Sequence, residues 1–206
     1  MNPAAHTATT LPVMEHFYTV QGEGAYSGVP AYFIRLGGCD VGCFWCDVKD
    51  SWDAEKHPKY SIEEIVRWVT STAANIAVIT GGEPLMHNLD ALTTELHAKG
   101  IRTHIETSGA HPLSGNWDWI TFSPKKFKEP HADIFDKAHE LKIIAYNKHD
   151  FEWAKQYQKL VNTSCSLYLQ PEWDKSEQML PQIIEFVKQN HPWRISLQTH
   201  KFMNIP

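Results

Sequence analysis

Three cysteines stand close together in a run that can bind a metal centre. Cys39, Cys43 and Cys46 have the spacing C-x3-C-x2-C and follow an apolar stretch over residues 31–36. Four cysteines usually hold an iron–sulfur cluster, and such a closed set of ligands suits electron transfer or a structural role. Catalytic metal sites instead keep an open position for substrate. The triad therefore predicts a cluster with one iron open for chemistry.

The fourth cysteine, Cys165, lies far along the chain in a run that alternates like a half-buried strand. Free cysteine is among the most buried residue types, so we interpret Cys165 as a packed core residue. The alternative is a fourth ligand that closes the cluster. A triad can also hold zinc, or belong to an electron-carrier cluster in a binding module.

The composition excludes several classes of function. The chain has 206 residues, 42% of them hydrophobic, and we expect a single domain over residues 13–206 after a flexible lead-in over residues 1–12. A net charge of −5 without a basic stripe gives no indication of nucleic-acid binding. We find neither an apolar run of the roughly 18 to 20 residues that span a bilayer nor the features of a signal peptide. A cytoplasmic protein with reduced thiols is expected.

Short apolar runs alternate with helical patterns along the chain. The expected strands cover residues 31–36, 76–80, 102–106, 119–123, 141–145, 166–170 and 194–198. The first expected helix begins at a capping box over residues 61–64. The second covers residues 88–99, with Asn88 as its cap and Gly100 as its stop, and two more cover residues 151–160 and 176–189. This alternation predicts an α/β fold with a parallel sheet, either doubly wound or curled into a barrel.

Polar or metal-binding loops follow five of the expected strands. They are the cysteine loop, residues 81–84, residues 107–109, residues 124–125 and Pro171. In parallel α/β folds the carboxyl ends of the strands share one face, where ligands bind, so we expect these loops to converge. In residues 81–84 (Gly-Gly-Glu-Pro), the glycines let a ligand approach the backbone and Glu83 can accept hydrogen bonds from an ammonium group. An ordinary strand-exit turn is the alternative.

The cysteine triad, with Trp45 before its last member and the glycine motif downstream, resembles the radical S-adenosylmethionine (SAM) superfamily. The resemblance implies a [4Fe-4S] cluster on the three cysteines and bound SAM. The residues that it implies around SAM are Trp45, Asp47, Gly81, Gly82, Glu83, Thr107, Ser108, Ser123, Lys125 and Gln170.

Seven segments over nearly the whole chain are similar to the 7-carboxy-7-deazaguanine synthase family. They cover residues 17–24, 27–36, 79–84, 105–109, 123–125, 169–171 and 197–201. The resemblance implies an incomplete TIM-like βα barrel with reduced helices, a homodimer, and an electron-donor flavodoxin or ferredoxin. It implies ring contraction of 6-carboxy-5,6,7,8-tetrahydropterin to 7-carboxy-7-deazaguanine with release of ammonia, on the way to queuosine. An activase that makes a glycyl radical on a partner protein shares the cluster and SAM, and is the alternative.

Residue types in these segments suit a flat, polar heterocycle that carries a carboxylate. Gln21 and Glu23 can bind the donor and acceptor edge of a ring, and Arg35 can clamp a carboxylate, unless it is a surface cation. No catalytic residue is assigned, although Glu23, His200 and Lys201 are conceivable proton carriers. The substrate-binding residues that the sequence and the resemblance together indicate are Val20, Gln21, Gly22, Glu23, Arg35, Thr80, His200 and Pro206.

One position departs from the family pattern. Family members commonly have threonine after the Cys-Asp pair, and its hydroxyl is associated with a magnesium ion that bridges to the substrate carboxylate. Here the run is Cys46-Asp47-Val48, and valine has no oxygen for a hard cation. Either Asp47 takes over as a ligand or the site works without the ion, with Lys49 or another cation balancing charge. We expect the second.

Overall fold

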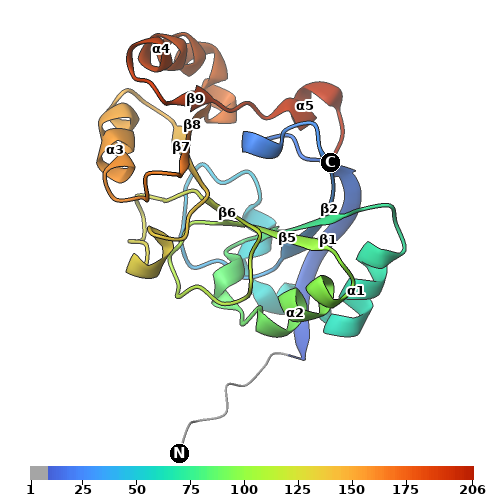
Figure 1. Ribbon diagram of the computed structural model, residues 1–206. Coiled ribbons are helices and arrows are strands. Elements are labelled where there is room, and N and C mark those ends of the chain that lie inside the picture. The colour runs from blue at the N-terminus through green and yellow to red at the C-terminus, as the bar shows by residue number, and fades with distance from the viewer. Residues whose placement is uncertain (1–8) are drawn as a thin grey trace, which may run out of the picture.

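The computed structural model describes residues 9–206, and its body is a curved sheet of nine strands (Figure 1). The strands are β1 (Thr10–Val20), β2 (Pro30–Leu36), β3 (Lys59–Ser61), β4 (Ile76–Gly81), β5 (Arg102–Thr107), β6 (Trp119–Phe122), β7 (Glu140–Ala145), β8 (Ser166–Pro171) and β9 (Arg194–Ile195). Their order in the sheet is β3-β1-β2-β4-β5-β6-β7-β8-β9. β1 runs antiparallel to both of its neighbours, and the strands from β2 to β9 are parallel.

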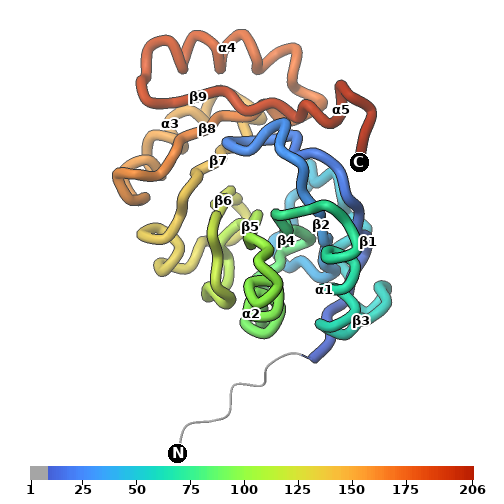
Figure 2. Tube along the Cα trace, turned by 45° about the vertical axis from the view of Figure 1, so that its right-hand side comes forward, coloured from blue at the N-terminus to red at the C-terminus, as the bar shows by residue number. Residues whose placement is uncertain are grey.

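The strand order decides between the two expected architectures. A doubly wound sheet reverses its order at a switch point, whereas here the parallel strands follow one another in sequence. The chain trace sweeps round an open arc, and β9 does not pair with β3 in the described part of the chain (Figure 2). The fold is therefore an incomplete α/β barrel, as expected.

Helices are few. They are α1 (Ile62–Thr70), α2 (Asp90–Ala98), α3 (His149–Gln158), α4 (Ser176–Gln189) and the short α5 (Thr199–Met203). A single 3-10 turn, Ala132–Ile134, replaces a helix between β6 and β7, and residues 108–118 connect β5 to β6 without one. None of the helices in residues 9–206 is both long and apolar enough to cross a membrane.

All seven expected strands are present, but β1 and β3 were not expected. β1 starts at Thr10, and Leu11, only 1% exposed, pairs with Tyr60 of β3. The expected flexible lead-in is therefore wrong at residues 10–12, because strand pairing and burial hold them in the sheet, while residues 1–8 lie outside the described part. Pro12 made this strand hard to predict, since proline is rare within sheets.

Three expected boundaries also need correction. Asn88 does not cap α2, because Leu89 occupies the N-cap position. The Asn88 side chain instead accepts the N–H of Asp90 at 3.0 Å within a turn. The last expected strand ends at Ile195 instead of residue 198, because the chain leaves the sheet there to form α5. The expected helix over residues 151–160 spans His149–Gln158. The capping box at Ser61 is confirmed, as is the stop at Gly100, whose φ is +74°.

The alternation of side chains along the strands makes the inside of the barrel polar. In β5, Ile105 packs in the main hydrophobic core, while His104 and Glu106 line cavities inside the barrel. In β7, Leu141 belongs to the core, while Lys142 faces inward. The sheet thus buries one face under the helices and presents charged groups on the other.

Candidate active site

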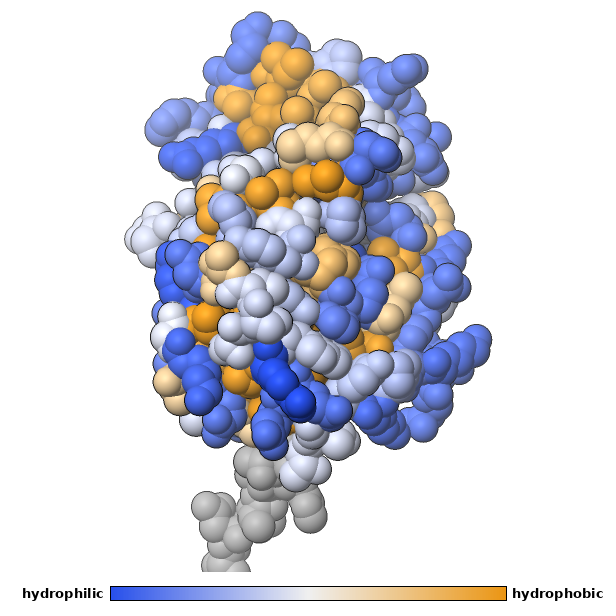
Figure 3. Space-filling model, turned by 90° about the vertical axis from the view of Figure 1, so that its right-hand side faces the viewer, coloured by the Kyte–Doolittle hydropathy of each residue, from blue (hydrophilic) through white to orange (hydrophobic). Residues whose placement is uncertain are grey.

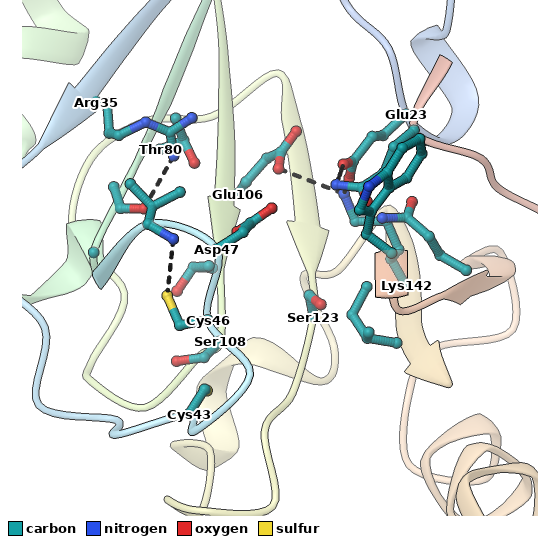
Figure 4. A pocket seen from close by; sticks show the side chains of 18 of the residues that line it. Glu23, Arg35, Cys43, Cys46, Asp47, Thr80, Glu106, Ser108, Ser123 and Lys142 are labelled. Carbon is teal, nitrogen blue, oxygen red and sulfur yellow. Dashed lines mark hydrogen bonds and ion pairs between the residues drawn. The ribbon is translucent and has the colours of Figure 1, made fainter. Parts of the chain in front are cut away.

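The carboxyl ends of the parallel strands surround a cavity of about 270 Å³. Its walls come from the loops after β1, β2, β4, β5, β6 and β8 and from the C-terminal segment. Figure 4 shows side chains around this space from the loops after β1, β2, β5 and β6 and from strands β2, β4, β5 and β7. The expected loops therefore converge. Among the sequence-derived candidates, the lining includes Val20, Gln21, Gly22, Glu23, Arg35, Cys39, Cys43, Trp45, Cys46, Asp47, Val48, Thr80, Gly81, Gly82, Glu83, Thr107, Ser108, Ser123, Lys125, Gln170, His200 and Pro206. Lys201 is not part of it.

The three cysteines of the loop after β2 have free thiols and line the same cavity. Burial raises the pKa of Cys43 to about 11 and also raises that of Cys39, so a metal centre must displace protons to bind. The Val48 N–H donates to the sulfur of Cys46 at 3.4 Å, a contact that suits a thiolate. No three His, Cys, Asp or Glu side chains in residues 9–206 converge on one ion position. The thiolates of an iron–sulfur cluster bind different irons, so they need not converge on one ion position.

Cys165 lies away from this cavity. It precedes β8, and so lies at the amino end of the strand, whereas Gln170 and Pro171 at the carboxyl end line the cavity. It is 8% exposed and packs in the main core. The core interpretation is confirmed, and the cavity offers a cluster three cysteines with no fourth.

The Gly-Gly-Glu-Pro loop after β4 packs directly on the start of the cysteine loop. The Glu83 N–H donates to the Gly38 carbonyl at 2.8 Å, and a Cβ on Gly82 would lie 2.0 Å from the same oxygen. A Cβ on Gly81 would lie 2.8 Å from the carbonyl oxygen of Leu36. The protein's own backbone thus fills the space that these glycines leave. Glycine is required at these two positions because two loops of the protein pack together there. We had expected that a ligand approaches the backbone at this point.

The carboxylate of Glu83 ties this loop to the loop after β5. It accepts the hydroxyls of Thr107 and Ser108, both at 2.5 Å, and the N–H groups of Ser108 and Leu85, at 2.8 and 3.0 Å. Glu83 is only 1% exposed. An ammonium ligand would share a carboxylate that already accepts four hydrogen bonds, so the first role of Glu83 is to fix Thr107 and Ser108 in the cavity wall.

Lys125 places a cation in the cavity wall beside the cysteine loop. Its ammonium donates to the Ser123 hydroxyl at 2.8 Å and to the Ser123 carbonyl. Burial lowers the pKa of Lys125, and the nearby Cys43 partly offsets this effect. An anionic group of a ligand would find a fixed positive charge here.

The opposite side of the cavity carries a buried ion-pair network (Figure 4). Lys142 of β7 forms an ion pair with Glu23 and a second with Glu106 of β5, at 3.4 Å. Gln198 donates to Glu23 at 3.0 Å, and Gln21 donates to Glu106 at 2.8 Å. Our sequence reasoning missed Glu106, Lys142 and Gln198. The available signal was the pair of charges at alternate positions of β7, Glu140 and Lys142, in an otherwise apolar strand.

Arg35 of β2 lies beside Thr80 at the edge of the cavity (Figure 4). Its Nε donates to Glu15 of β1 at 2.6 Å, and its Nη1 donates to the Gly81 carbonyl at 3.3 Å. These bonds orient the guanidinium and leave Nη2 without a protein acceptor among the described residues. Arg35 therefore lies in the cavity wall and is more than a surface cation.

The C-terminal segment covers the seam between β9 and the loop after β1. The N–H and hydroxyl of Thr199 both donate to the Gly22 carbonyl at 2.9 Å. Next to it, burial lowers the pKa of His200, which faces the cavity. Lys201 is outside the cavity lining and donates to Asp47 at 3.1 Å, so the carboxylate offered as a magnesium ligand is held by a lysine. The Val48 side chain, without an oxygen, occupies the cavity wall beside it.

Glu172, after β8, also lines the cavity and was missed from the sequence. It is 9% exposed, and its Oε1 accepts the Asp174 N–H at 3.3 Å. Its Oε2 is buried and has no hydrogen-bond partner within residues 9–206. Such a group is costly unless a ligand or water satisfies it.

The chain is similar to known proteins over nearly its whole length. Residues 33–159 match the model of the radical SAM superfamily. A 7-carboxy-7-deazaguanine synthase of Flavobacterium psychrophilum is 53% identical over 98% of this chain and 96% of the relative, and one of Synechocystis is 45% identical over 100% and 99%. The crystal structure of QueE from Escherichia coli superposes with a TM-score of 0.83 at 32% identity, covering 91% of this chain and 93% of that one. The chain therefore belongs to the radical SAM superfamily and, within it, to the 7-carboxy-7-deazaguanine synthase family.

Proposed function

We propose that this chain converts 6-carboxy-5,6,7,8-tetrahydropterin into 7-carboxy-7-deazaguanine with loss of ammonia, as a carbon–nitrogen lyase of the radical SAM type. One observation carries the proposal beyond family membership. Three free cysteines and a receptor made of Gln21, Glu23, Glu106 and Arg35 line a single cavity. A heterocycle bound by the receptor would thus be held close to a cofactor bound by the cysteines.

The residues present fit the cofactors that the family implies. Cys39, Cys43 and Cys46 would hold a [4Fe-4S] cluster, and SAM would lie along the wall that Glu83 organises. When bound, these groups supply a carbon-centred radical that takes a hydrogen atom from the substrate. Aromatic walls of the cavity exclude water from such a species; they are Phe17, Phe33, Trp52 and Trp173.

The chain's own residues bind and orient the pterin. Arg35 offers a guanidinium to the substrate carboxylate, and the Glu23 and Glu106 carboxylates accept from the N–H groups of the ring. Glu23 or His200 is placed to move a proton during ammonia loss, since both line the cavity. Lys201 is the weaker candidate, because its ammonium is bound to Asp47 outside the lining. Pro206 lines the cavity at the C-terminal end.

Anaerobic assay of the reconstituted protein tests the proposal. We expect about four irons and four sulfides per chain, together with formation of the deazaguanine acid from the carboxypterin. The Cys43→Ala variant should lose both iron and turnover. SAM cleavage without any product from the pterin would contradict the proposed substrate, and would favour the activase alternative.

We also propose that the reaction does not need magnesium. The position that would carry a hydroxyl is Val48, and Asp47 is held by Lys201. Turnover after treatment with a chelator should equal turnover with added magnesium. Activity that disappears with the chelator and returns with the ion would contradict this. The matched variant Val48→Thr should gain a response to magnesium.

An acidic flavodoxin or ferredoxin is the proposed electron donor. Phe44, inside the cysteine loop, is 57% exposed and packs edge-on against Phe127 and Tyr146. The ammonium of Lys175 lies over the Tyr146 ring. Lys175→Glu should slow turnover driven by the donor protein and leave turnover driven by dithionite unchanged. Lys99→Glu, at the opposite ends of the strands, is the control that should change neither. A protein with reduced cysteine thiols and an electron donor of this kind is proposed to work in the cytoplasm.

A homodimer is proposed from the family resemblance. On the face shown in Figure 3, apolar side chains gather in the upper part of the molecule, at the level of α4 and α5. Phe202 and Met203 of α5 are 72% and 48% exposed. Light scattering should give twice the chain mass, and Phe202→Glu should weaken the dimer if α5 contributes to the contact. A monomer at micromolar concentration would contradict the proposal.

A further inference from the structure

Lys142 is the most deeply buried of the three charged groups in the ion-pair network. Its side chain is 4% exposed, while those of its partners Glu23 and Glu106 are 14% and 23% exposed. All three residues line the cavity, and the two carboxylates present more of their surface to a ligand than the ammonium does. Lys142 therefore acts on a ligand mainly through the two carboxylates that it binds.

The two carboxylates come from different parts of the chain. Glu23 lies in the loop after β1, and Glu106 near the end of β5. Without a cation between them, two buried carboxylates this close would repel each other, and one would take up a proton. The charge of Lys142 opposes the effect of burial and, with hydrogen bonds from Lys142 and Gln198, lowers the pKa of Glu23 to about 2. The Lys142 pKa is raised, against the effect of burial, by Glu106, Glu23 and Glu140.

The hydrogen bonds leave acceptor capacity on the cavity side. Each of the four carboxylate oxygens of Glu23 and Glu106 accepts one bond from the protein, from Gln198, Gln21 or Lys142. An ionised carboxylate has about four acceptor sites, so each retains about two. Ionised carboxylates can only accept hydrogen bonds, and the receptor therefore matches a ring edge that presents neighbouring N–H donors.

We propose that Lys142 is a positioning residue that holds Glu23 and Glu106 together as a two-acceptor receptor, and so makes the cavity selective for heterocycles with adjacent N–H groups. The inference rests on the proposed function, because it concerns how the substrate of that reaction is selected. The other titratable groups that face this network are Glu140, which accepts the Ala25 N–H at 2.9 Å, and Lys125, His104 and His200.

Lys142→Met is the direct test, because methionine fills a similar volume without charge. Binding is measured on the oxidised holoenzyme with SAM, which cannot turn over, using the carboxypterin and an analogue without the 2-amino group. We expect the Kd for the carboxypterin to rise about 10- to 100-fold. The preference of the wild type for the carboxypterin over the analogue should shrink about tenfold in the variant.

The pH profile separates this role from a purely structural one. In Lys142→Met one carboxylate regains a proton at neutral pH, so affinity should recover as pH rises from about 6 to about 8.5, while wild-type affinity stays flat. Cleavage of SAM by the dithionite-reduced enzyme without substrate should be retained, since Lys142 lies away from the cysteine loop. An unchanged Kd, or a loss of affinity that is equal for both ligands at every pH, would overturn the proposal.

A second variant keeps the test decisive if Lys142→Met does not fold. Lys142→Met with Glu106→Gln removes one positive and one negative charge together, and should bind the carboxypterin about as well as Glu106→Gln alone. A double variant that binds the carboxypterin about tenfold or more weaker than Glu106→Gln alone would contradict a shared function. A wild-type protein that does not bind the carboxypterin would refute the proposed function itself. Wild-type binding with an unaffected Lys142→Met would refute this inference alone.

Discussion

Glu83 is joined to Ser108 by two hydrogen bonds to one carboxylate oxygen, from the Ser108 N–H at 2.8 Å and from its hydroxyl at 2.5 Å. The two residues lie in loops that follow neighbouring parallel strands, β4 and β5. Because the Glu83 N–H also donates to Gly38, one residue connects three loops of the cavity. This wall of the cavity is thus built around a buried carboxylate.

Glu83→Gln should destabilise the protein, because an amide has a single acceptor oxygen where four donors converge. We expect the free energy of unfolding to fall by about 2–4 kcal/mol, and the Tm by about 5 to 15 °C. Urea and thermal unfolding of the metal-free protein measure this. Glu95→Gln, exposed on α2, is the matched control and should change the free energy by less than about 0.5 kcal/mol. Equal stability of the two variants would show that the network is dispensable.

The sequence was sufficient for the parallel strands and for the convergence of the cysteine loop with the loops after β4, β5 and β6. Runs such as residues 76–80 are short and apolar and end at a glycine, so the composition of the run and its boundary both indicate a strand. The triad and the residues after each strand are local signals, and the topology of parallel folds brings them together. β1 escaped prediction because its partner β3 has three residues and because Pro12 interrupts it.

The side of the cavity with the ion-pair network depends on contacts that no local pattern shows. Lys142 and Glu106 come from strands separated by β6, and they meet Glu23 because the barrel curves. The role of Gly82 was also hidden, since it depends on the Gly38 carbonyl of another loop. Sequence spacing indicates which residues leave the same face of a strand, whereas pairing across the barrel needs coordinates.

His104 should make stability depend on pH. It is 4% exposed, its Nε2 has no partner in the described chain, and burial, aided by Arg102, lowers its pKa to about 4 from 6.5. Between these values the unfolded chain binds a proton that the folded protein does not. Stability should therefore fall as pH drops from 6.5 to about 4, by on the order of 2 kcal/mol.

His104→Phe should flatten this part of the profile, because the aromatic neighbours Tyr26 and Trp119 accept a ring without a titrating nitrogen. Urea unfolding at a series of pH values gives the measurement. His149→Gln, at an exposed position, should leave the slope as in the wild type. A slope that survives in His104→Phe would assign the effect to another group.

Cys165 should behave as an inert thiol. Burial raises its pKa to about 12, and its side chain packs in the core. In the folded, metal-free protein, iodoacetamide should label Cys39 and Cys46 and spare Cys165, as peptide mass spectrometry would show. Cys165→Ala should retain the iron of the wild type at a cost of about 1 kcal/mol in stability, whereas Cys46→Ala should lose it. Loss of iron in Cys165→Ala would restore the case for a fourth ligand.

Glu172 should strengthen the binding of SAM and, in the ligand-free protein, lower the free energy of unfolding. Its buried Oε2 lacks a donor within residues 9–206, and the residue lines the same cavity as the cysteines. A nucleoside hydroxyl would satisfy that oxygen, so Glu172→Ala should raise the Kd for SAM about tenfold, while the ligand-free protein stays within about 1 kcal/mol of the wild type or gains stability. Equilibrium dialysis and urea unfolding measure the two effects, with Glu95→Ala as the control. A variant that loses stability and keeps its affinity for SAM would assign Glu172 to the fold, because its Oε1 contact with the Asp174 N–H would then be the interaction that matters.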